Sequence, residues 1–396
     1  MKKRLGIYIH SGSDSDFSGV NKKIANHIKA LSEEFDVHEV ILKKEPTNMI
    51  KSIMWRLPGG SWGFEYRDAL DDISSITNEV GQALFFYIRA CPPDRCYSKF
   101  VCTLRERFPE SRIIMEIPAF PYARSFLRDK TMWPWYFKDK VNRSKLAKCL
   151  DRIVAVSDQY EYIWGVKTIT VINGIDVDNI RPIIRKKSEK GVIRLLAVAR
   201  FQPAHGYERI INGLSEYYKH GGSREIELHM IGDGPDVCYY KSLAVSSGLN
   251  DRVIFYGSKT GTELDDCYDD MNIGLGGFGL YKTGITKTSG LKVCEYLAKG
   301  LPVVSGAPDI AFDRGGERFF LQYPNEPVAV DIGRMIEWYD DLVSNSTDEI
   351  GLINDIRDFA RNSVDIKMTM RPVIQYLLND ERGDSKKGEA VNADKK

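Results

Sequence analysis

The chain has 396 residues, 43% of them hydrophobic and 28% charged, which leaves room for two globular domains with ample cores. A formal net charge of +1 argues against a protein that binds nucleic acid through bulk electrostatics. The seven cysteines include no Cys-x2-Cys pair, so the sequence indicates neither a disulfide framework nor a zinc site, and we expect reduced, cytosolic thiols.

The first predicted element is a buried strand at residues 5–10, an apolar run too short for a signal peptide or a membrane span. A loop then leads to Gly19 and a helix, and a short strand follows at residues 37–42. This order is typical of a βαβ start whose helix N-terminus can bind an anion. The loop carries Asp14 and Asp16 as Asp-x-Asp, a motif that can hold a metal, but after a first strand we interpret both as solvated loop charges.

Two further strands are predicted at residues 83–88 and 112–117, with a helix between them at residues 99–108. The alternation points to a doubly wound α/β sheet. Glu116 lies near the carboxyl end of the second strand, at the edge where open parallel sheets bind ligands. We therefore consider Glu116 a candidate for substrate contact or proton handling; the alternative is a capped strand end.

Residues 122–148 are rich in basic side chains and interleaved with aromatic ones. Such a mixture suits a surface that lies on anionic lipid, with aromatic rings at headgroup depth and basic groups toward phosphate. Residues 54–57 and 62–64 could add to that face. The alternative is that the aromatic residues belong to the core of the first domain and the charges are simply solvated.

A second α/β series begins at residue 194, after a polar linker at residues 184–190. Its first strand is followed directly by Arg200 and then by a loop that contains His205 and Gly206. Later strands are predicted at residues 227–231 and 253–256, and the latter ends at Gly257. These repeated strand and helix patterns predict a second doubly wound domain.

Residues 274–279 spell Gly-x-Gly-x-x-Gly, the pattern of a dinucleotide-binding turn. Such a turn should open a helix directly and should be followed by an acidic residue at the end of the next strand, and neither condition holds. We interpret these glycines instead as allowing a ligand to come close to the backbone.

The stretch 286–304 contains the clearest anion site. Ser289 and Gly290 precede a helix, and Gly300 followed by Pro302 ends it. The first turn offers free N–H groups and the positive end of the helix dipole, which bind phosphate. Lys292 lies in that turn and Glu295 three residues later, so both can face one ligand that carries phosphate and hydroxyl groups. The alternative is a surface helix with an exposed Lys–Glu pair.

This stretch, with Ser-Gly-Leu-Lys at 289–292, Glu-Tyr-Leu-Ala at 295–298 and Pro-Val-Val at 302–304, resembles the donor-binding helix of retaining glycosyltransferases of family 4. Asn-Gly-Ile-Asp at 173–176 is similar to the end of the first domain in that family. The resemblance implies the GT-B fold: two facing, doubly wound, Rossmann-like domains with a cleft between them. It implies an acceptor-side domain at 1–183, a donor domain at 191–362, a terminal helix at 363–380 that crosses back, and a disordered tail at 381–396.

In that family a Glu-x7-Glu pair binds the donor, and its second glutamate holds the ribose. This second glutamate corresponds to Glu295, whereas Lys287 replaces the first glutamate of the pair. Arg200 matches an arginine that faces the diphosphate, His205 replaces a lysine, and Arg209 could compensate. The resemblance thus implies Arg200 and Lys292 as catalytic residues, with Glu116 as a candidate. It implies a donor site made of Gly19, His205, Gly206, Arg209, Gly257, Lys287, Ser289, Gly290, Leu291 and Glu295.

The resemblance implies that the protein transfers a sugar from a nucleotide diphosphate donor, with UDP favoured, and that the sugar keeps its anomeric configuration. The implied acceptor is a saccharide or lipid-linked saccharide in surface polysaccharide or glycoconjugate synthesis. We expect no metal or other cofactor, a cytoplasmic protein, and peripheral binding to an anionic membrane surface. Two alternatives remain open at this point: a nucleotide-sugar epimerase of the same fold, and a non-catalytic subunit that binds nucleotide sugars.

Overall fold

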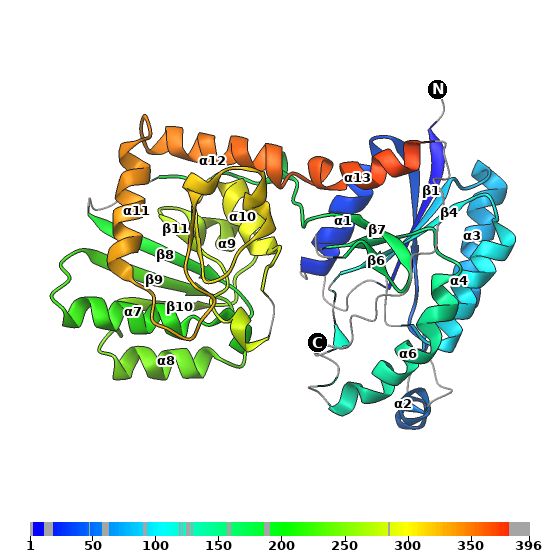
Figure 1. The fold of residues 1–396 in the computed structure, drawn as a ribbon, viewed down its shortest axis with the longest axis horizontal. Helices are drawn as coiled ribbons and strands as arrows, with labels where there is room; N and C mark the ends of the chain where they lie inside the picture. Colours follow the sequence, from blue (N-terminus) through cyan, green and yellow to red (C-terminus); the bar gives the residue numbers. More distant parts are fainter. Residues whose placement is uncertain are drawn as a thin grey trace. The chain divides into compact units, whose positions relative to one another are not determined.

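The structure is a computed structural model that describes residues 3–11, 19–46, 48–57, 63–89, 93–118, 120, 122–123, 127, 130–156, 160–185, 191–283 and 286–379. The chain divides into two compact units. Unit 1 comprises residues 1–171 and 370–396, and unit 2 comprises residues 172–369. Each unit is built around its own, mainly parallel β-sheet (Figure 1).

Unit 1 contains a sheet with the strand order β2-β1-β3-β4-β5-β7-β6, as far as its residues are described. All neighbouring strands run parallel except β6 and β7. The strands are β1 (Arg4–His10), β2 (Phe35–Ile41), β3 (Phe85–Arg89), β4 (Arg112–Ile117), β5 (Arg152–Ala155), β6 (Tyr162–Ile163) and β7 (Val166–Thr170). The helices of this unit include α1 (Gly19–Ser32), α2 (Met49–Arg56), α3 (Tyr66–Val80), α4 (Arg95–Arg107) and α6 (Trp133–Ala147).

Unit 2 contains a parallel sheet with the order β10-β9-β8-β11-β12-β13. The strands are β8 (Val192–Val198), β9 (Glu225–Ile231), β10 (Val253–Gly257), β11 (Ile273–Leu275), β12 (Val303–Ser305) and β13 (Phe320–Gln322). The helices include α7 (Glu208–Lys219), α8 (Val237–Ser246), α9 (Gly261–Tyr268), α10 (Leu291–Lys299), α11 (Ile332–Ser344) and α12 (Glu349–Ser363). This strand order, in which the sheet grows outward in both directions from the first strand, is that of a Rossmann fold.

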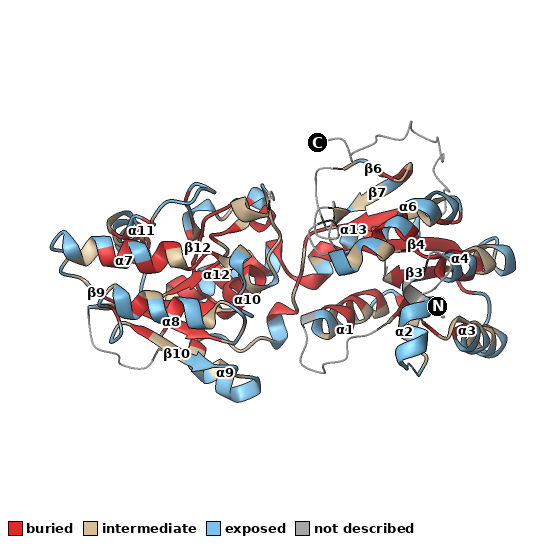
Figure 2. Cartoon of the chain, turned by 90° about the horizontal axis from the view of Figure 1, so that it is seen from below, coloured by how far each residue is buried: buried red, intermediate tan, exposed pale blue. Residues whose placement is uncertain are grey.

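The cores lie on both faces of these sheets because successive strand residues point to opposite sides. In β8, Leu195 and Ala197 join a cluster with α7 and α11, whereas Leu196 joins a cluster with α10 and α12. Figure 2 shows the strands as mainly buried and the outward helix faces as exposed. The predicted fold class, two doubly wound α/β sheets, is therefore confirmed.

The last described helix, α13 (Ile366–Leu378), begins in unit 2, and its residues from Met370 onward belong to unit 1. In unit 1 the ring of Tyr376 lies close to two guanidinium groups, with Arg112 at 5.0 Å and Arg152 at 4.8 Å from its centre. Arg112 also donates hydrogen bonds to the carbonyl groups of Tyr376 and Asn379. Cationic groups at a helix C-terminus stabilise its unpaired carbonyls, so these contacts fix the helix end on the sheet.

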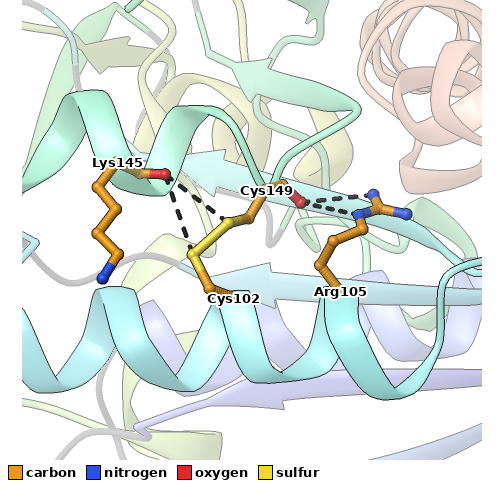
Figure 3. The surroundings of a disulfide bond; sticks show 4 residues. All are labelled: Cys102, Arg105, Lys145 and Cys149. Atoms are coloured by element: carbon orange, nitrogen blue, oxygen red, sulfur yellow. Dashed lines mark hydrogen bonds between the residues drawn. A yellow bond between two sulfur atoms is a disulfide. The ribbon is translucent and has the colours of Figure 1, made fainter.

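The prediction of reduced thiols throughout the chain is wrong, because a disulfide joins Cys102 on α4 to Cys149 just after α6 (Figure 3). Arg105 on α4 donates to the carbonyl group of Cys149 and pairs with Asp151. The bond links two helices that pack side by side although the cysteines are 47 residues apart. No local spacing pattern indicates such a pair.

Among the described residues of the basic and aromatic segment 122–148, some side chains lie in the core of unit 1 and others lie at its surface. Lys138 is only 4% exposed and its ammonium lies 4.2 Å from the centre of the Trp135 ring. Asp139 is fully buried and pairs with Arg143. Trp133, Phe137 and Val141 are exposed at i, i+4 and i+8 of α6. The surface thus carries a narrow apolar stripe rather than the whole segment.

Within the part of the chain that the structure describes, no helix has both the length and the apolar character needed to span a bilayer. The predicted solvated charges Asp14 and Asp16, and the predicted tail at 381–396, lie outside the described residues.

Candidate active site

The N-terminus of α10 is built by the turn that precedes it. Gly290 takes an extended backbone as N-cap, and Gly300, with φ +87°, ends the helix in a left-handed conformation. The amide of Gly290 donates to Asp309 Oδ2 at 2.9 Å. Among the described residues, the amides of Leu291 and Lys292 have no hydrogen-bond acceptor. These two N–H groups are therefore the ones that can bind an anion.

Ser289 is fixed by a residue that is distant in sequence. Its Oγ accepts a hydrogen bond from the amide of Asn173 at 2.8 Å, and its carbonyl accepts one from Asn173 Nδ2 at 2.5 Å. Asp309, on the other side, accepts from Gly290 and Ala311. Both partners hold the turn in place, so the first turn of α10 is organised before any ligand binds.

Lys292 projects from the first turn toward Tyr207. Its ammonium donates to the Tyr207 hydroxyl at 3.1 Å and lies 5.5 Å from the centre of that ring. Burial without a carboxylate partner lowers the pKa of Lys292 to about 7. An anion at the helix N-terminus would favour the protonated form and restore its full positive charge.

His205 lies beside the same tyrosine, with its ring parallel to that of Tyr207 and the ring centres 5.8 Å apart. Its Nδ1 accepts a hydrogen bond from the amide of Gln202 at 3.0 Å. Burial, with a smaller contribution from the charge of Lys292, lowers the pKa of His205 to about 3. The ring is therefore neutral with its proton on Nε2, which makes it a hydrogen-bond donor but not a cation.

Arg200 lies two residues after the end of β8, and α10 lies between β11 and β12 in the chain. Because β8, β11 and β12 are parallel, the start of α10 and Arg200 lie at the same carboxyl edge of the sheet. The order β9-β8-β11 places this edge at the topological switch point, where Rossmann folds bind their ligands. Arg200 is exposed and makes no hydrogen bond or ion pair to the rest of the described chain.

Arg209 is held by backbone carbonyl groups. It is 2% exposed, and its guanidinium donates to the carbonyl groups of Phe278, Pro324 and Val328. These contacts tie α7 to two loops and occupy three of the five N–H donors of the guanidinium. The sequence shows a cation in the right order but not the carbonyl groups that surround it, and a role of Arg209 in place of the missing lysine stays a prediction.

The other predicted donor residues lie around the same edge with varied surroundings. Glu295 is partly buried, and its carboxylate adds to the effect of burial in raising the pKa of Tyr268. Lys287 pairs with Asp313, and Leu291 is at the surface. Gly257 ends β10 with φ +68° and no protein atom near the position of a Cβ.

The glycines of the loop serve protein packing more than ligand approach. A Cβ on Gly206 would lie 2.4 Å from the amide nitrogen of Gly279. Likewise a Cβ on Gly274 would meet the ring of Tyr296 at 2.5 Å, and one on Gly276 would meet Ser305 at 2.8 Å. Protein packing is therefore sufficient to explain the glycines at these positions, and close approach of a ligand to Gly274 and Gly276 stays a prediction.

Glu116 and Gly19 belong to unit 1. Gly19 is the first residue of α1, as predicted for a helix that follows the first strand. Glu116 is fully buried on β4 and contacts Lys23, His27 and Arg89. Burial alone would raise the pKa of Glu116, but the charges of Lys23 and Arg89 hold it well below its usual range, so the group is an ionised carboxylate and a poor proton carrier.

Sequence reasoning missed Asn173, Tyr207 and Asp309 as parts of the site. Asn173 stands in an Asn-Gly pair that predicts a turn, and this masks its contact with Ser289. Tyr207 and Asp309 belong to no sequence motif. Only their position as buried polar residues near the N-terminus of α10 marks them, and burial is known from the structure rather than from the sequence.

Comparison with known proteins supports the fold. Residues 177–312 match the family model described as glycosyl transferases group 1. No curated protein sequence matches the chain. The match includes β8 to α10, with Arg200, His205, Lys292 and Glu295.

Several solved structures have the same fold at low sequence identity. A sucrose-phosphate synthase from Thermosynechococcus elongatus is 14% identical, with a TM-score of 0.61 and coverage of 94% of this chain and 99% of that chain. Anabaena HepE in complex with UDP is 12% identical, with a TM-score of 0.60 and the same coverage. The lipopolysaccharide outer core galactosyltransferase WaaB is 13% identical, with a TM-score of 0.56 and again that coverage. The two Rossmann-like units are therefore those of the GT-B fold.

Proposed function

We propose that this protein is a retaining glycosyltransferase of family 4 that moves a sugar from a nucleotide diphosphate donor, UDP being favoured, to a hydroxyl acceptor. The observation that carries the proposal is the first turn of α10, where the amides of Leu291 and Lys292 have no acceptor among the described residues and which also carries the Lys292 ammonium. This arrangement suits a diphosphate. Anabaena HepE, which has the same fold, has been crystallised with UDP and with UDP-glucose.

The leaving group of this reaction is a nucleoside diphosphate, so the negative charge that develops on it must be stabilised. Arg200 and Lys292 are the cations available for that role, with the helix N-terminus and the Nε2–H of His205 as neutral donors. Glu295 accepts from the donor ribose. We propose that these groups replace a metal ion, and that the departing phosphate oxygen takes the proton of the acceptor hydroxyl.

For the acceptor we propose a saccharide or lipid-linked saccharide of a surface polysaccharide or glycoconjugate. The exposed stripe Trp133, Phe137 and Val141 on α6, next to the exposed Lys140, supports peripheral contact with an anionic membrane, consistent with a site at its cytoplasmic face. The lipopolysaccharide outer core galactosyltransferase WaaB has the same fold.

The test is incubation with a panel of nucleotide sugars and saccharide acceptors, following free nucleotide, new nucleotide sugar and glycosylated acceptor. We expect release of free nucleotide together with an elongated acceptor. A new nucleotide sugar without acceptor use would identify an epimerase, and binding without turnover would identify a non-catalytic subunit.

A paired substitution links the assay to the site. Glu295→Gln should weaken UDP binding by about 1–3 kcal/mol because it removes a charged hydrogen-bond acceptor. Glu337→Gln, an exposed glutamate on α11, is the matched control and should bind UDP as the wild type does. Equal affinity in both variants would remove Glu295 from the donor site.

A further inference from the structure

One side of α2 is apolar and exposed. The helix has eight residues, and Met49, Ile50, Ile53 and Met54 on it, with its C-cap Leu57, are each more than half exposed. These positions follow the spacing i, i+1, i+4, i+5 and i+8, which places them on one face that covers about 140° of the helix. A face of this kind normally packs against another element of the fold. On α2 it is open to solvent.

The segment that carries α2 has its two ends joined. Lys44 and Phe64 form an antiparallel bridge, and the amide of Glu45 donates to the carbonyl group of Gly63 at 2.7 Å. Phe64 is buried, so this bridge is anchored in the core of unit 1. Figure 1 shows α2 beyond the ends of α1 and α3. The bridge therefore holds α2 on unit 1 without burial of the apolar face.

The bridge lies at the carboxyl edge of the sheet in unit 1. The segment follows β2 in the chain, and the amide of Leu42, the residue after β2, donates to the carbonyl group of His10, the last residue of β1, at 2.8 Å. Open parallel sheets bind ligands at this edge. A partner that covers α2 is therefore adjacent to the edge where unit 1 can bind a substrate.

The charge around α2 indicates the partner. Residues 43–57 contain four basic residues and one acidic residue, a net charge of +3, whereas the whole chain has a net charge of +1. The one acidic residue, Glu45, pairs with Lys51 at 3.5 Å, and Lys43 is exposed. An exposed apolar face bordered by basic side chains is typical of a helix that lies in the interface of an anionic membrane.

A second copy of the chain is a poorer occupant of this face. A helix of eight residues is about 12 Å long and about 10 Å wide, so two copies of α2 alone bury far less than the roughly 1,200 Å² of a stable protein interface. Contact between two copies would also bring two segments of net charge +3 together. A lipid surface has neither disadvantage, because it extends beyond the helix and carries the opposite charge.

We propose that α2 is a membrane-interface helix. Its apolar face, here named the α2 face and formed by Met49, Ile50, Ile53, Met54 and Leu57, enters the boundary between the headgroups and acyl chains of an anionic lipid bilayer. This role of α2 rests on the proposed function, and it deepens that function because it places the carboxyl edge of unit 1 beside the membrane that holds a lipid-linked acceptor. The exposed stripe on α6 is a separate contact, formed by other side chains.

The experiment is sedimentation of the full chain with vesicles, without donor or acceptor. One set of vesicles is phosphatidylcholine alone, and the other also contains phosphatidylglycerol. We expect the wild type to bind the acidic vesicles. Ile50→Ser combined with Ile53→Ser should weaken this binding at least about tenfold, because two apolar side chains no longer enter the lipid.

Two controls accompany this variant. Ile50→Leu combined with Ile53→Leu keeps the apolar area and should bind as the wild type does. Val245→Ser combined with Ile350→Ser changes two exposed apolar positions of unit 2 and should also bind as the wild type does.

A second pair of variants tests the charge. Lys43→Gln combined with Lys51→Gln should lower the preference for acidic over neutral vesicles at least about fivefold. The matched control is Lys219→Gln combined with Lys259→Gln, which likewise removes one exposed lysine and one lysine paired with a glutamate, Glu263. This control should keep the preference of the wild type. Sedimentation velocity without vesicles measures the oligomeric state of each variant.

Equal recovery of the wild type in the supernatant with acidic vesicles and without vesicles would overturn the inference. Vesicle binding that the serine pair at Ile50 and Ile53 leaves unchanged would also overturn it, because another surface would then make the contact. A wild-type dimer that the same serine pair dissociates, with no vesicle binding, would assign the α2 face to a second copy of the chain instead.

The proposed function fails separately from this role of α2. Vesicle binding that depends on α2, with no donor consumed, would refute only the transferase. Transfer of sugar to a soluble acceptor, with no vesicle binding, would refute only the role of α2.

Discussion

Lys292 has the charge that departure of a diphosphate requires, yet burial beside Tyr207 lowers its pKa to about 7. The ligand-free protein therefore holds a mixture of neutral and protonated Lys292 near neutral pH. An incoming anion shifts that mixture toward the protonated form because it removes the cost of a lone buried cation. The proposed donor site therefore couples donor binding to proton uptake at Lys292.

We predict that UDP binding takes up a proton at about pH 8, and that affinity falls by up to about tenfold per pH unit above pH 7. Calorimetry in buffers of different ionisation enthalpy measures the proton, and titration across this range measures the affinity. Lys292→Met should abolish both effects, and Lys219→Met, an exposed lysine at the end of α7, should leave them unchanged. Affinity that does not vary with pH in the wild type would contradict this account.

Asp309 presents the opposite titration. It is buried, and the loss of hydration raises its pKa from 3.8 to about 6 although it accepts hydrogen bonds from Gly290 and Ala311. A carboxyl group whose pKa rises on folding stabilises the protein relative to the unfolded chain at low pH. That contribution is lost as pH rises from 3.8 through about 6.

The wild type should therefore lose stability relative to Asp309→Asn as the pH rises. The difference between their free energies of unfolding should fall by at most about 3 kcal/mol between roughly pH 4 and pH 7. Urea unfolding at a series of pH values measures the difference. Asp71→Asn, at an exposed position on α3, should give a difference that does not vary in this way. A flat curve for Asp309→Asn would show that the carboxyl group titrates normally.

At the scale of elements, α6 presents its exposed apolar stripe while its other side packs in unit 1. Phe137 is 60% exposed and Val141 78% exposed. If the stripe enters a lipid interface, replacing these two residues removes much of the buried apolar area. Lys138 and Arg143 cannot serve as lipid contacts in this arrangement, because one is buried and the other pairs with Asp139.

We predict that the wild type sediments with vesicles that contain acidic lipid at low salt, and that Phe137→Ser with Val141→Ser reduces binding by at least about tenfold. The matched control replaces Val245 and Ile350, two exposed apolar residues of unit 2, with serine. Equal recovery of the wild type in the supernatant with and without acidic vesicles would exclude the membrane proposal and favour an acceptor in solution.

The bond between Cys102 and Cys149 ties α4 to the end of α6. It closes a loop of 47 residues, and the chain-entropy model gives about 4 kcal/mol of stabilisation for such a loop. We expect a thiol reductant to lower the free energy of unfolding of the wild type by up to about this amount. Replacing both cysteines with serine should lower the free energy of unfolding by a similar amount without any reductant. The unfolding of this variant should then not respond to reductant.

Cys238→Ser, at an exposed free cysteine, is the control for this measurement and should respond to reductant as the wild type does. A wild type whose unfolding is the same with and without reductant would show that the bond contributes no stability.

At the scale of the whole molecule, the proposed chemistry uses side chains and helix amides in place of a metal ion. We predict that treatment with a chelator leaves sugar transfer unchanged, because the proposed mechanism assigns stabilisation of the leaving group to Arg200, Lys292 and α10. The assay is donor turnover before and after the treatment, with added manganese or magnesium as the comparison. Complete loss of turnover, restored by either metal, would contradict a metal-independent mechanism.

The sequence by itself determined the features that depend on local pattern. Apolar runs that alternate with segments of helical periodicity predict both sheets, and the two ends of α10 follow from Gly290 and Gly300. These predictions succeed because strand and helix periods, caps and glycine conformations act over a few residues. The positions of Arg200 and Lys292 at the carboxyl edge of a sheet follow from the same local reasoning together with the rule for parallel strands.

Only the tertiary structure decided which charges remain available. Arg209 is held by three carbonyl groups, while Glu116 is neutralised by Lys23 and Arg89. The same holds for Cys102 and Cys149, which meet because α4 packs against α6. The physical reason is that the strength of a charge or the reactivity of a thiol depends on burial and on partners from distant parts of the chain, and neither leaves a pattern of short spacing in the sequence.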